Sequence, residues 1–305
     1  MSGHVSVLFR QSLEALPLEE GRLFIDGTLG GGGHSEGILK ASKGRLIAID
    51  KDIDAIERCK VRLAPYEDRV TFVHDDFKNI TSILENLGGQ KADGAILDLG
   101  VSSFQLDEAE RGFSYAKEAP LDMRMDRSNP FSAYQVVNEY THPELARVIY
   151  EYGEESFGGR IASAILKNRP IETTTQLAEI VKNAIPAARR RSGGHPAKKT
   201  FQAIRIEVNG ELDTLRDTVN AFIEALAPGG RLAIITFHSL EDRIVKKTFQ
   251  TAERPCTCPP DFPQCVCGKV SKGRAVTRKP ILPDEAEIEE NPRSRSAKLR
   301  IFERQ

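Results

Sequence analysis

Residues 23–35 read LFIDGTLGGGGHS, and this stretch decides the fold class. A short apolar run ends at Asp26, four consecutive glycines follow from Gly30 to Gly33, and a helix-compatible segment begins near Ser35. A strand, a glycine-rich turn and a helix in this order are typical of nucleotide-binding α/β sheets. Glycine lacks the Cβ atom that would hold a ligand away from the backbone. We therefore expect the turn after Asp26 to approach a ligand closely.

The same alternation extends outward from this stretch. Short β-branched apolar runs alternate with amphipathic segments, which indicates a parallel sheet covered by helices. The predicted strands are 23–26, 45–50, 70–74 and 94–99, and the predicted helices are 35–41, 53–63 and 80–87. Towards the C-terminus we expect a long amphipathic helix at 203–227, a break at 228–230, a strand at 231–237 and a final antiparallel pair at 275–282 and 297–303, with the acidic segment 284–290 between the last two.

The strand signal stops near residue 106, and the next hundred residues read as helical. Capping boxes at Thr141 with Glu144 and at Thr173 with Gln176 mark two helix starts there. The predicted fold class is therefore α/β, a Rossmann-like sheet with an inserted all-helical domain. We assign 1–106 and 206–305 to a discontinuous ligand-binding domain and 107–205 to the insertion.

Length, apolar content and the positions of the cysteines limit the classes of protein to which this chain can belong. The chain has 305 residues, of which 40% are hydrophobic, enough for two domains. No run of about 18 apolar residues occurs, and the first residues do not resemble a signal peptide. Four of the five cysteines lie between 256 and 267, which is not a secreted disulfide framework. We expect a cytoplasmic protein with no membrane partner, and the sequence leaves monomer and dimer open.

Positive charge is concentrated in one segment although the chain as a whole has a net charge of −1. Residues 160–205 contain ten basic and two acidic residues, a net charge of +8, so the remainder carries −9. Phosphate neutralisation supplies most sequence-independent affinity for nucleic acid, so a basic segment of this kind favours an RNA or DNA partner. A solvated helical surface is the alternative.

Three ligand classes use a glycine-rich turn, and the surrounding residues separate them. A nucleoside triphosphate needs a lysine after the glycines, where this chain has His34 and Ser35. A dinucleotide fits the glycine spacing less well, although Asp50 stands where a ribose-binding carboxylate is expected. S-adenosylmethionine has a ribose and no phosphate, and residues 26–36 contain no lysine or arginine. The sequence favours S-adenosylmethionine and leaves a nicotinamide-dependent oxidoreductase as the alternative.

Acidic residues follow all four predicted strands. Asp26 and Asp50 end the first two, Asp75 and Asp76 with Phe77 follow the third, and Asp98 closes the fourth. Ligands of open α/β sheets lie at the carboxyl ends of the strands, so these groups are expected to line one crevice. Phe77 is expected to cover an adenine. Each aspartate alone is also an ordinary turn residue.

Six long motifs carry a family resemblance. They are DGTLGGGGHS at 26–35, DLGVSSFQLD at 98–107, PLDMRM at 120–125, HPAKKTFQAIR at 195–205, FHSLED at 237–242 and NPRSRSAKLR at 291–300. Together these resemble the bacterial small-subunit ribosomal RNA cytidine-N4 methyltransferases, the RsmH/MraW family, from residue 4 to near the C-terminus. The resemblance implies a class I methyltransferase fold with a helical insertion, S-adenosylmethionine as cofactor, and a decoding-centre cytidine of 16S ribosomal RNA in the small subunit as target. It implies cofactor contacts at Gly32, Gly33, His34, Asp50, Phe77, Asp98 and Gln105.

The chemistry limits the catalytic candidates. The N4 lone pair of cytosine is delocalised into the ring, so its hydrogens must be held by acceptors before it becomes nucleophilic, and no covalent enzyme nucleophile is required. Asp98, Ser102 and Ser103 are the candidate catalytic residues, and Asp122 is a weaker one; helix or turn capping is the alternative role for all of them. The candidate substrate contacts are Arg124, Arg190, His195, Lys198, Lys199 and His238.

The cysteine cluster is a separate feature. Cys256, Cys258, Cys265 and Cys267 form two C-x-C pairs separated by a proline-containing loop. Paired thiolates bind zinc tetrahedrally, so these four are the candidate metal ligands for a structural zinc ion; thiols in a reducing compartment are the alternative. Cys59 is expected to be buried on a helix. A non-catalytic RNA-binding assembly factor remains a third alternative for the whole chain.

Overall fold

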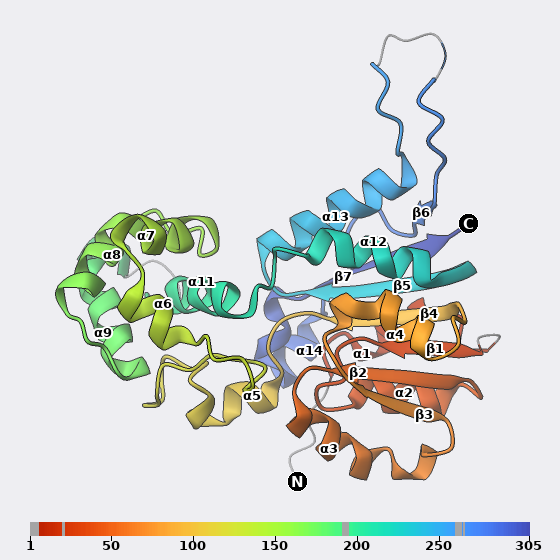
Figure 1. Cartoon of the computed structure of the whole chain (residues 1–305), viewed down its shortest axis with the longest axis horizontal. Coiled ribbons are helices and arrows are strands. Elements are labelled where there is room, and N and C mark those ends of the chain that lie inside the picture. The colour runs from red at the N-terminus through yellow and green to blue at the C-terminus, as the bar shows by residue number, and fades with distance from the viewer. Residues whose placement is uncertain (1–5, 20–21, 191–194, 260–263, 265) are drawn as a thin grey trace. The chain divides into compact units, whose positions relative to one another are not determined.

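The structure is a computed structural model that describes residues 6–19, 22–190, 195–259, 264 and 266–305 (Figure 1). Within these residues one sheet has the strand order β3-β2-β1-β4-β5-β7-β6. Strands β1 to β5 run parallel, and β7 runs antiparallel to both β5 and β6. The strands are β1 (Leu23–Asp26), β2 (Arg45–Asp50), β3 (Val70–His74), β4 (Ala92–Asp98), β5 (Leu226–Thr236), β6 (Gly273–Ala275) and β7 (Lys298–Arg304).

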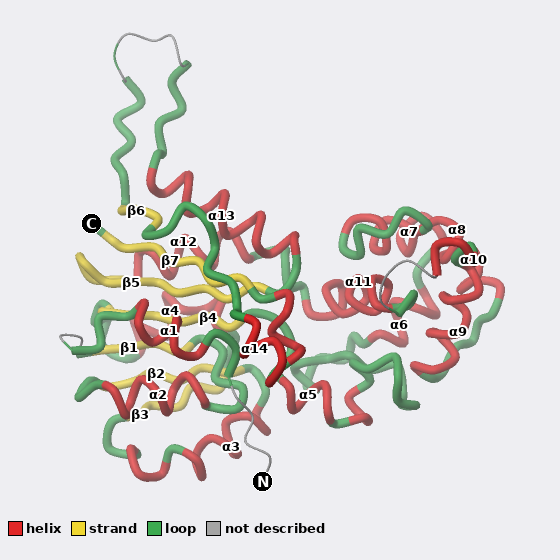
Figure 2. Tube along the Cα trace, turned by 180° about the vertical axis from the view of Figure 1, so that it is seen from behind, coloured by secondary structure: helices red, strands yellow, loops and turns green. Residues whose placement is uncertain are grey.

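The sheet has helices on both faces, which explains its continuous apolar strands. Figure 1 shows α4, α12 and α13 on one face, and Figure 2 shows α1 and α2 on the other, where α3 also packs. Neighbouring residues of β1 enter different cores: Ile25 packs with the α4, α12 and α13 side, and Phe24 with the α1, α2 and α3 side. The helices are α1 (Phe9–Ala15), α2 (Gly33–Ala41), α3 (Ile53–Arg62), α4 (Ile80–Asn86), α12 (Leu215–Ala225), α13 (Ser239–Glu253) and α14 (Glu285–Glu290).

The described chain divides into two compact units, Met1–Gly100 with Leu212–Gln305, and Val101–Glu211. The second unit begins earlier and ends later than the predicted insertion at 107–205. Its described residues contain the helices α5 (Ser103–Asp107), α6 (Ala133–Glu139), α7 (His142–Glu151), α8 (Gly158–Lys167), α9 (Thr174–Ala184), α10 (Ala187–Arg190) and α11 (Lys198–Asn209). Their apolar faces form a core of their own, and the capping boxes at Thr141 and Thr173 are confirmed. The predicted α/β fold with a helical insertion is thus confirmed.

The first three predicted strands are confirmed with the same bounds, and the helices near them differ by a residue or two. The helix predicted over 203–227 is wrong. Gly210 ends α11 with a φ of 56°, a left-handed conformation that suits glycine, and α12 begins only at Leu215. Periodicity continues across this break because both helices bury an apolar face, so the pattern alone does not reveal it.

Strand β5 also begins earlier than predicted. Leu226 pairs with Ala92, and regular pairing resumes between Arg231 and Gly94, so residues 228–230 form an irregularity within the strand. The prediction treated Pro228-Gly229-Gly230 as a boundary, whereas a bulge accommodates these residues. The strand predicted at 297–303 is confirmed within a residue as β7, but its predicted partner at 275–282 is wrong: β6 covers Gly273–Ala275, and beyond it Ile281 makes only an isolated bridge to Leu299.

The described residues also form short 3-10 helices and one further helix, α1. Short 3-10 helices lie at Ala64–Tyr66, Phe77–Asn79, Ala109–Arg111 and Pro292–Ser296. Helix α1, which the pattern did not predict, begins after Leu8, whose backbone N–H donates to Glu287 Oε1 at 2.6 Å. Among the helices of the described residues, none has the length and apolarity needed to cross a bilayer.

Candidate functional site

The carboxyl ends of β1, β2 and β4 bring three aspartates together. In the strand order, chain connections run to one side from β1 through β2 to β3 and to the other side from β4 to β5, so β1 and β4 flank the switch point of the sheet. Ligands of open α/β sheets bind outside the strand ends at this point. Asp26, Asp50 and Asp98 each close one of these strands. The aspartates that the sequence placed at these three strand ends therefore lie at one edge of the sheet, and their role in lining a ligand crevice stays a prediction.

Asp26 fixes the start of the glycine-rich turn through two side-chain hydrogen bonds. Its side chain is only 2% exposed, and its two oxygens accept hydrogen bonds from Ser35 Oγ at 2.7 Å and from the Thr28 backbone N–H at 3.1 Å. Burial raises the pKa of Asp26 to about 6 although both hydrogen bonds act to lower it. Asp26 therefore ties the start of the turn to helix α2.

Asp50 holds the middle of the same turn. One of its oxygens accepts the Gly30 backbone N–H at 2.8 Å, and the other accepts the Asp52 N–H at 2.9 Å. Burial raises the pKa of this carboxyl group, and the two hydrogen bonds oppose that effect. An ionised carboxylate offers about four lone-pair positions, so Asp50 retains capacity for further donors such as ribose hydroxyls.

The glycines are needed by the protein's own packing as well as by any ligand. Gly32 has a φ of 74°, and a Cβ atom there would lie 2.8 Å from Cys59 Sγ. A Cβ on Gly33 would collide with Ser6 Oγ. The close backbone approach predicted from the glycines is therefore partly an approach to neighbouring chain segments.

One cation reaches the turn from outside it. Arg62 of α3 donates from Nη1 to the Gly31 carbonyl at 2.7 Å, and its Nη2 lies 2.7 Å from Glu36 Oε2. The sequence of the turn contains no basic residue, and this contact from α3 could not be read from it. Glu36 also pairs with Lys40, so two cations share the single negative charge of this carboxylate.

His34 links the turn to Asp98. Its Nε2 lies 3.2 Å from the Val7 carbonyl, which can only accept, so Nε2 carries a proton. Its Nδ1 lies 3.9 Å from Asp98 Oδ2, and the ring is 6% exposed. Thr28 adds a second link, because its Oγ1 accepts the Asp98 backbone N–H at 2.6 Å. The turn and the end of β4 are therefore fixed to each other.

Asp98 is a strongly perturbed carboxyl group at this edge of the sheet. Burial raises the pKa of Asp98 to about 8, with smaller contributions from the negative charges of Asp26 and Glu241. Its Oδ1 is buried and has no hydrogen-bond partner among the described residues, although 27% of the whole side chain is exposed. Buried polar atoms without partners are rare and costly in native proteins, and strongly perturbed carboxyl groups in clefts mark functional sites.

Glu241 is the residue that the sequence argument missed. It lies in the quoted FHSLED motif, is 2% exposed, and accepts the Phe237 backbone N–H at 2.9 Å. It also completes a capping box with His238, whose Nδ1 accepts the Glu241 N–H at 3.4 Å and whose Nε2 lies 3.1 Å from Glu241 Oε1. The spacing of the motif could have indicated this cap. His238, a predicted substrate contact, thus caps the start of α13 with its side chain only 7% exposed.

The groups that follow β3 cap the backbone. Asp75 accepts the Asp76 backbone N–H at 2.7 Å and the Asn79 side-chain amide at 2.8 Å, and Asp76 accepts the Lys78 N–H. Phe77 is partly buried, with its ring centroid 6.5 Å from that of Phe222. Its position after β3 agrees with the predicted element, and its contact with an adenine stays a prediction.

The candidates that follow Asp98 in sequence belong to the second unit. Ser102 caps α5: its hydroxyl accepts the Gln105 N–H at 3.3 Å, and Gln105 Oε1 accepts the Ser102 N–H at 3.1 Å. Gln105 is 6% exposed. The side chain of Ser103 lies outside the described residues. Ser102 thus has the capping role that was left open as its alternative, and Gln105 completes the same capping box, a role that was not predicted for it. The catalytic role of Ser102 and the cofactor contact of Gln105 stay predictions.

Asp122 and Arg124 form a closed local pair. Arg124 donates from Nε and Nη2 to the two Asp122 oxygens at 2.9 and 2.8 Å, and from Nη1 to the carbonyls of Arg127 and Asn129. Burial raises the pKa of Asp122, but the bonds from Arg124 outweigh burial and lower it overall. Most donors of Arg124 are therefore engaged within its own loop.

The basic residues of the second unit that were predicted to contact substrate differ in their contacts within the protein. His195 is exposed and stacks on Tyr115, with ring centroids 4.4 Å apart and ring planes 10° from parallel. Lys199 donates to the Glu154 carbonyl at 2.8 Å, whereas Lys198 is exposed. The side chain of Arg190 lies outside the described residues. Sequence reasoning did not single out Tyr115, because nothing in the local pattern pairs it with a residue 80 positions away.

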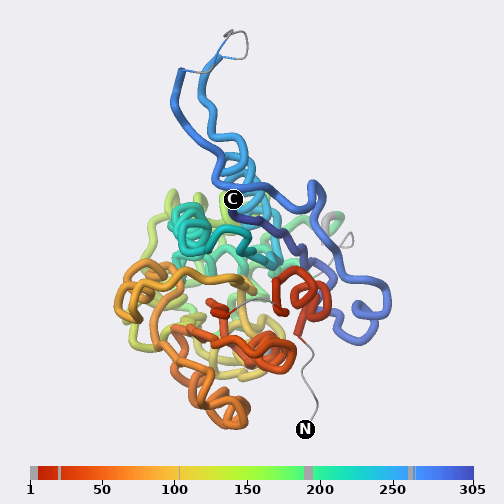
Figure 3. The backbone as a smooth tube through the Cα atoms, turned by 90° about the vertical axis from the view of Figure 1, so that its right-hand side faces the viewer, coloured from red at the N-terminus to blue at the C-terminus, as the bar shows by residue number. Residues whose placement is uncertain are grey.

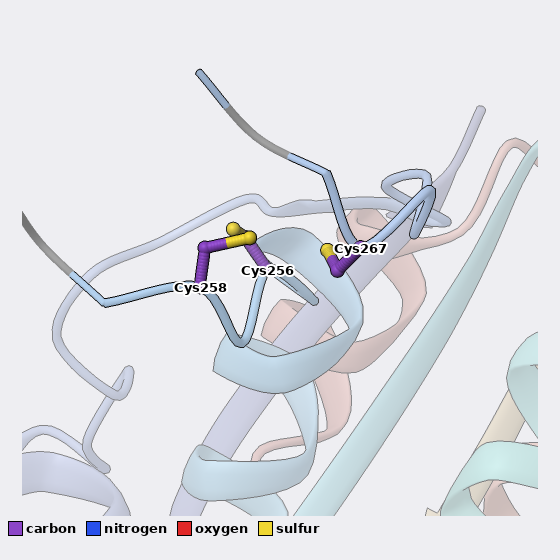
Figure 4. Close-up of side chains that lie close together, drawn as sticks. All are labelled: Cys256, Cys258 and Cys267. Atoms are coloured by element: carbon purple, nitrogen blue, oxygen red, sulfur yellow. The ribbon is translucent and has the colours of Figure 1, made fainter. Parts of the chain in front are cut away.

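Three of the four predicted metal ligands are described, and they lie together. Cys256, Cys258 and Cys267 place their sulfur atoms within 4.8 Å of one another (Figure 4). Cys265 lies outside the described residues. Cys59 is buried, as predicted, and burial raises the pKa of its thiol to about 12, so it is separate from this cluster.

Comparison with known proteins adds a family to this geometry. The sequence profile described as the MraW methylase family matches residues 1–305. A protein of Agathobacter rectalis named Ribosomal RNA small subunit methyltransferase H 2 is 55% identical over 99% of this chain and 98% of its own length. A Clostridium botulinum protein named Ribosomal RNA small subunit methyltransferase H is 56% identical over 98% of this chain and 97% of its own.

A solved structure described as a putative rRNA-methylase from Clostridium thermocellum is similar over 99% of this chain and all of its own, at 12% identity and a TM-score of 0.45. A likeness at that level carries no functional inference. The profile match and the relatives do, because they span the chain from end to end. The chain belongs to the MraW methylase family.

Proposed function

We propose that this chain transfers the methyl group of S-adenosylmethionine to N4 of a cytidine in the decoding centre of 16S ribosomal RNA. The end-to-end likeness to proteins named ribosomal RNA small subunit methyltransferase carries the reaction class and the substrate. The assignment of N4 as the methylated atom rests on the family resemblance of the six motifs. The cytoplasm, where ribosomal subunits are, is the proposed compartment.

The polar groups at the strand ends of the first unit suit S-adenosylmethionine, which has a ribose and no phosphate. Asp50 has lone pairs left for ribose hydroxyls, and Arg62, which reaches the turn from α3, is already paired with Glu36. A dinucleotide would place a pyrophosphate on this turn, where the Arg62 guanidinium is already engaged by Glu36 and the Gly31 carbonyl. Gly32, Gly33, His34 and Phe77 complete the proposed cofactor contacts, with Gln105 added from the resemblance. The bound cofactor supplies an electrophilic methyl group on a sulfonium centre.

Asp98 is the proposed catalytic residue. Its carboxylate would accept a hydrogen bond from the cytosine amino group, which localises the nitrogen lone pair and aims it at the methyl donor. Only the ionised form of Asp98 can accept this hydrogen bond and then take the proton that the amino group loses after transfer, so with a pKa of about 8 for Asp98 the proposed rate should rise with pH up to about 8. Ser102 and Ser103 are the proposed helpers that position the target base.

The second unit supplies the proposed RNA contacts. Lys198, Lys199 and Arg190 belong to the basic segment and would neutralise phosphates that flank the target. The exposed pair of His195 on Tyr115 offers an aromatic surface on which an unpaired base can stack. His238 and Arg124 are weaker proposals, because capping and the Asp122 pair already engage them.

Two measurements test this function. Calorimetry should detect S-adenosylhomocysteine bound at micromolar or tighter affinity and no binding of NAD; the reverse result would support the oxidoreductase alternative. Isolated small ribosomal subunits should then accept label from S-[methyl-³H]adenosylmethionine, and Asp98→Asn should lower the rate by about 100-fold or more. A chain that binds subunits but transfers no label would instead be a non-catalytic assembly factor.

A further inference from the structure

The segment between α13 and β6 projects from the first unit as two arms that run side by side (Figures 1 and 3). It covers residues 254–272, and its described residues contain neither helix nor strand. None of those described residues is buried, and Val266 and Val270 are 72% and 80% exposed. At its base, the Lys272 N–H donates to the Ala252 carbonyl at 2.9 Å.

An apolar core therefore does not hold the described part of this segment in one conformation. Fixing one residue's backbone costs about 1–2 kcal/mol, and burial of apolar side chains normally offsets that cost. Small structures without a core use disulfides or metal ions instead. The two arms approach each other at the cysteines.

Three thiol groups from both arms converge at that point. Cys256 and Cys258 lie on the outgoing arm, and Cys267 on the returning arm points its sulfur toward them (Figure 4). All three sulfur atoms lie within 4.8 Å of one another. In a tetrahedral zinc site with Zn–S distances of about 2.3 Å, the sulfur atoms are about 3.8 Å apart. The 4.8 Å limit on the separations of these three sulfur atoms is compatible with that spacing.

The backbone around the thiols is arranged as thiolate ligands require. The Val266 N–H donates to Cys258 Sγ at 3.4 Å, which links the two arms and stabilises negative charge on that sulfur. Gly268, directly after Cys267, has a φ of 64°, so the chain turns sharply behind that ligand. Pro255 and Pro259 flank the outgoing pair and restrict its conformations.

We propose that Cys256, Cys258 and Cys267 bind a divalent zinc ion that joins the two arms of segment 254–272. Each thiol loses its proton when it ligates the metal, and a fourth ligand completes the tetrahedron. The proposed role of the ion is structural, because thiolates from the two arms would be cross-linked through it. It is also independent of the proposed methyl transfer.

The decisive experiment measures metal content. Protein grown in zinc-containing medium and purified under reducing conditions without chelators should carry about one zinc ion per chain by mass spectrometry of the metal. Cys256→Ser and Cys267→Ser should each lose most of it. Thr257→Ala, an exposed neighbour without a thiol, should keep it. Circular dichroism of each variant should match the wild type, which shows that the rest of the chain has folded.

Two further readouts distinguish the site from a redox pair or an adventitious ion. Cobalt added to the metal-free chain should give a thiolate-to-metal charge-transfer band that Cys267→Ser removes. Trypsin should cleave after the exposed Lys269 faster when a chelator has removed the metal. Protein with little zinc before and after reconstitution would overturn the proposal, as would zinc content unchanged in both serine variants or cysteines joined in a disulfide in freshly isolated protein.

Discussion

Replacement of Asp98 by asparagine should make the protein more stable at alkaline pH while removing its activity. In the folded chain the pKa of Asp98 is raised to about 8, chiefly by burial, whereas an exposed aspartate has a pKa near 3.8. Between these two values the folded state holds a proton that the unfolded state releases. Stability therefore falls as pH rises from about 4 to about 8, because the folded state binds more protons.

The size of the effect follows from the shift. About four pKa units correspond to an upper bound of about 6 kcal/mol at pH 8, at about 1.4 kcal/mol per unit. The side chain is 27% exposed, so solvent screening reduces this figure. The asparagine amide also needs a new hydrogen-bond acceptor, which offsets about 1–3 kcal/mol. We expect a net stabilisation of about 2 kcal/mol at pH 8, or a rise in Tm of about 4 °C.

Thermal unfolding of wild type and Asp98→Asn at pH 5 and pH 8 measures this directly. The difference in Tm should be small at pH 5 and should grow by pH 8. Asp68→Asn, which changes an exposed carboxylate, should show no such growth. Equal differences at both pH values, or a variant that is less stable at pH 8, would refute the argument that Asp98 carries an unfavourable buried charge.

Three other substitutions test separate parts of the site. Asp50→Ala removes the acceptor of the Gly30 N–H and the proposed ribose ligand. Calorimetry should therefore show at least a 100-fold loss of S-adenosylhomocysteine affinity, about 2.7 kcal/mol. Unchanged affinity would show that Asp50 does not belong to the cofactor site. Gly32→Ala places a Cβ atom 2.8 Å from Cys59 Sγ at a φ of 74°, and chemical denaturation should show a loss of about 1–3 kcal/mol. Lys198→Ala should weaken binding to small subunits and reduce the slope of log K against log salt by about 1, and an unaltered slope would mean that Lys198 contacts no phosphate.

The sheet could be predicted from sequence wherever one signal dominates. Strands β1, β2 and β3 are rich in apolar and β-branched residues and end in aspartate or histidine, and their bounds were predicted correctly. Prediction failed where two signals compete. Gly210 interrupts an amphipathic pattern without changing its polarity, and Pro228-Gly229-Gly230 mark a bulge within β5 rather than its edge.

The sequence predicted which chemical groups lie at the strand ends, but it did not predict which other residues contact them. Aspartates at strand ends could be read from the chain, because parallel strands align their carboxyl ends. The contacts of Arg62 with Gly31 and the effect of Glu241 on Asp98 could not, because they join residues that are distant in sequence. The raised pKa of Asp98 arises from burial, which only the folded structure provides.

The most direct test of the proposed reaction is to locate the transferred methyl group. Small ribosomal subunits should be methylated by the purified chain, and their RNA digested to nucleosides and to mapped fragments for mass spectrometry. We predict one new methyl group, on N4 of a single cytidine in the decoding centre, absent when Asp98→Asn is used. A methyl group on an adenine, on a ring carbon or on a ribosomal protein would contradict the proposal.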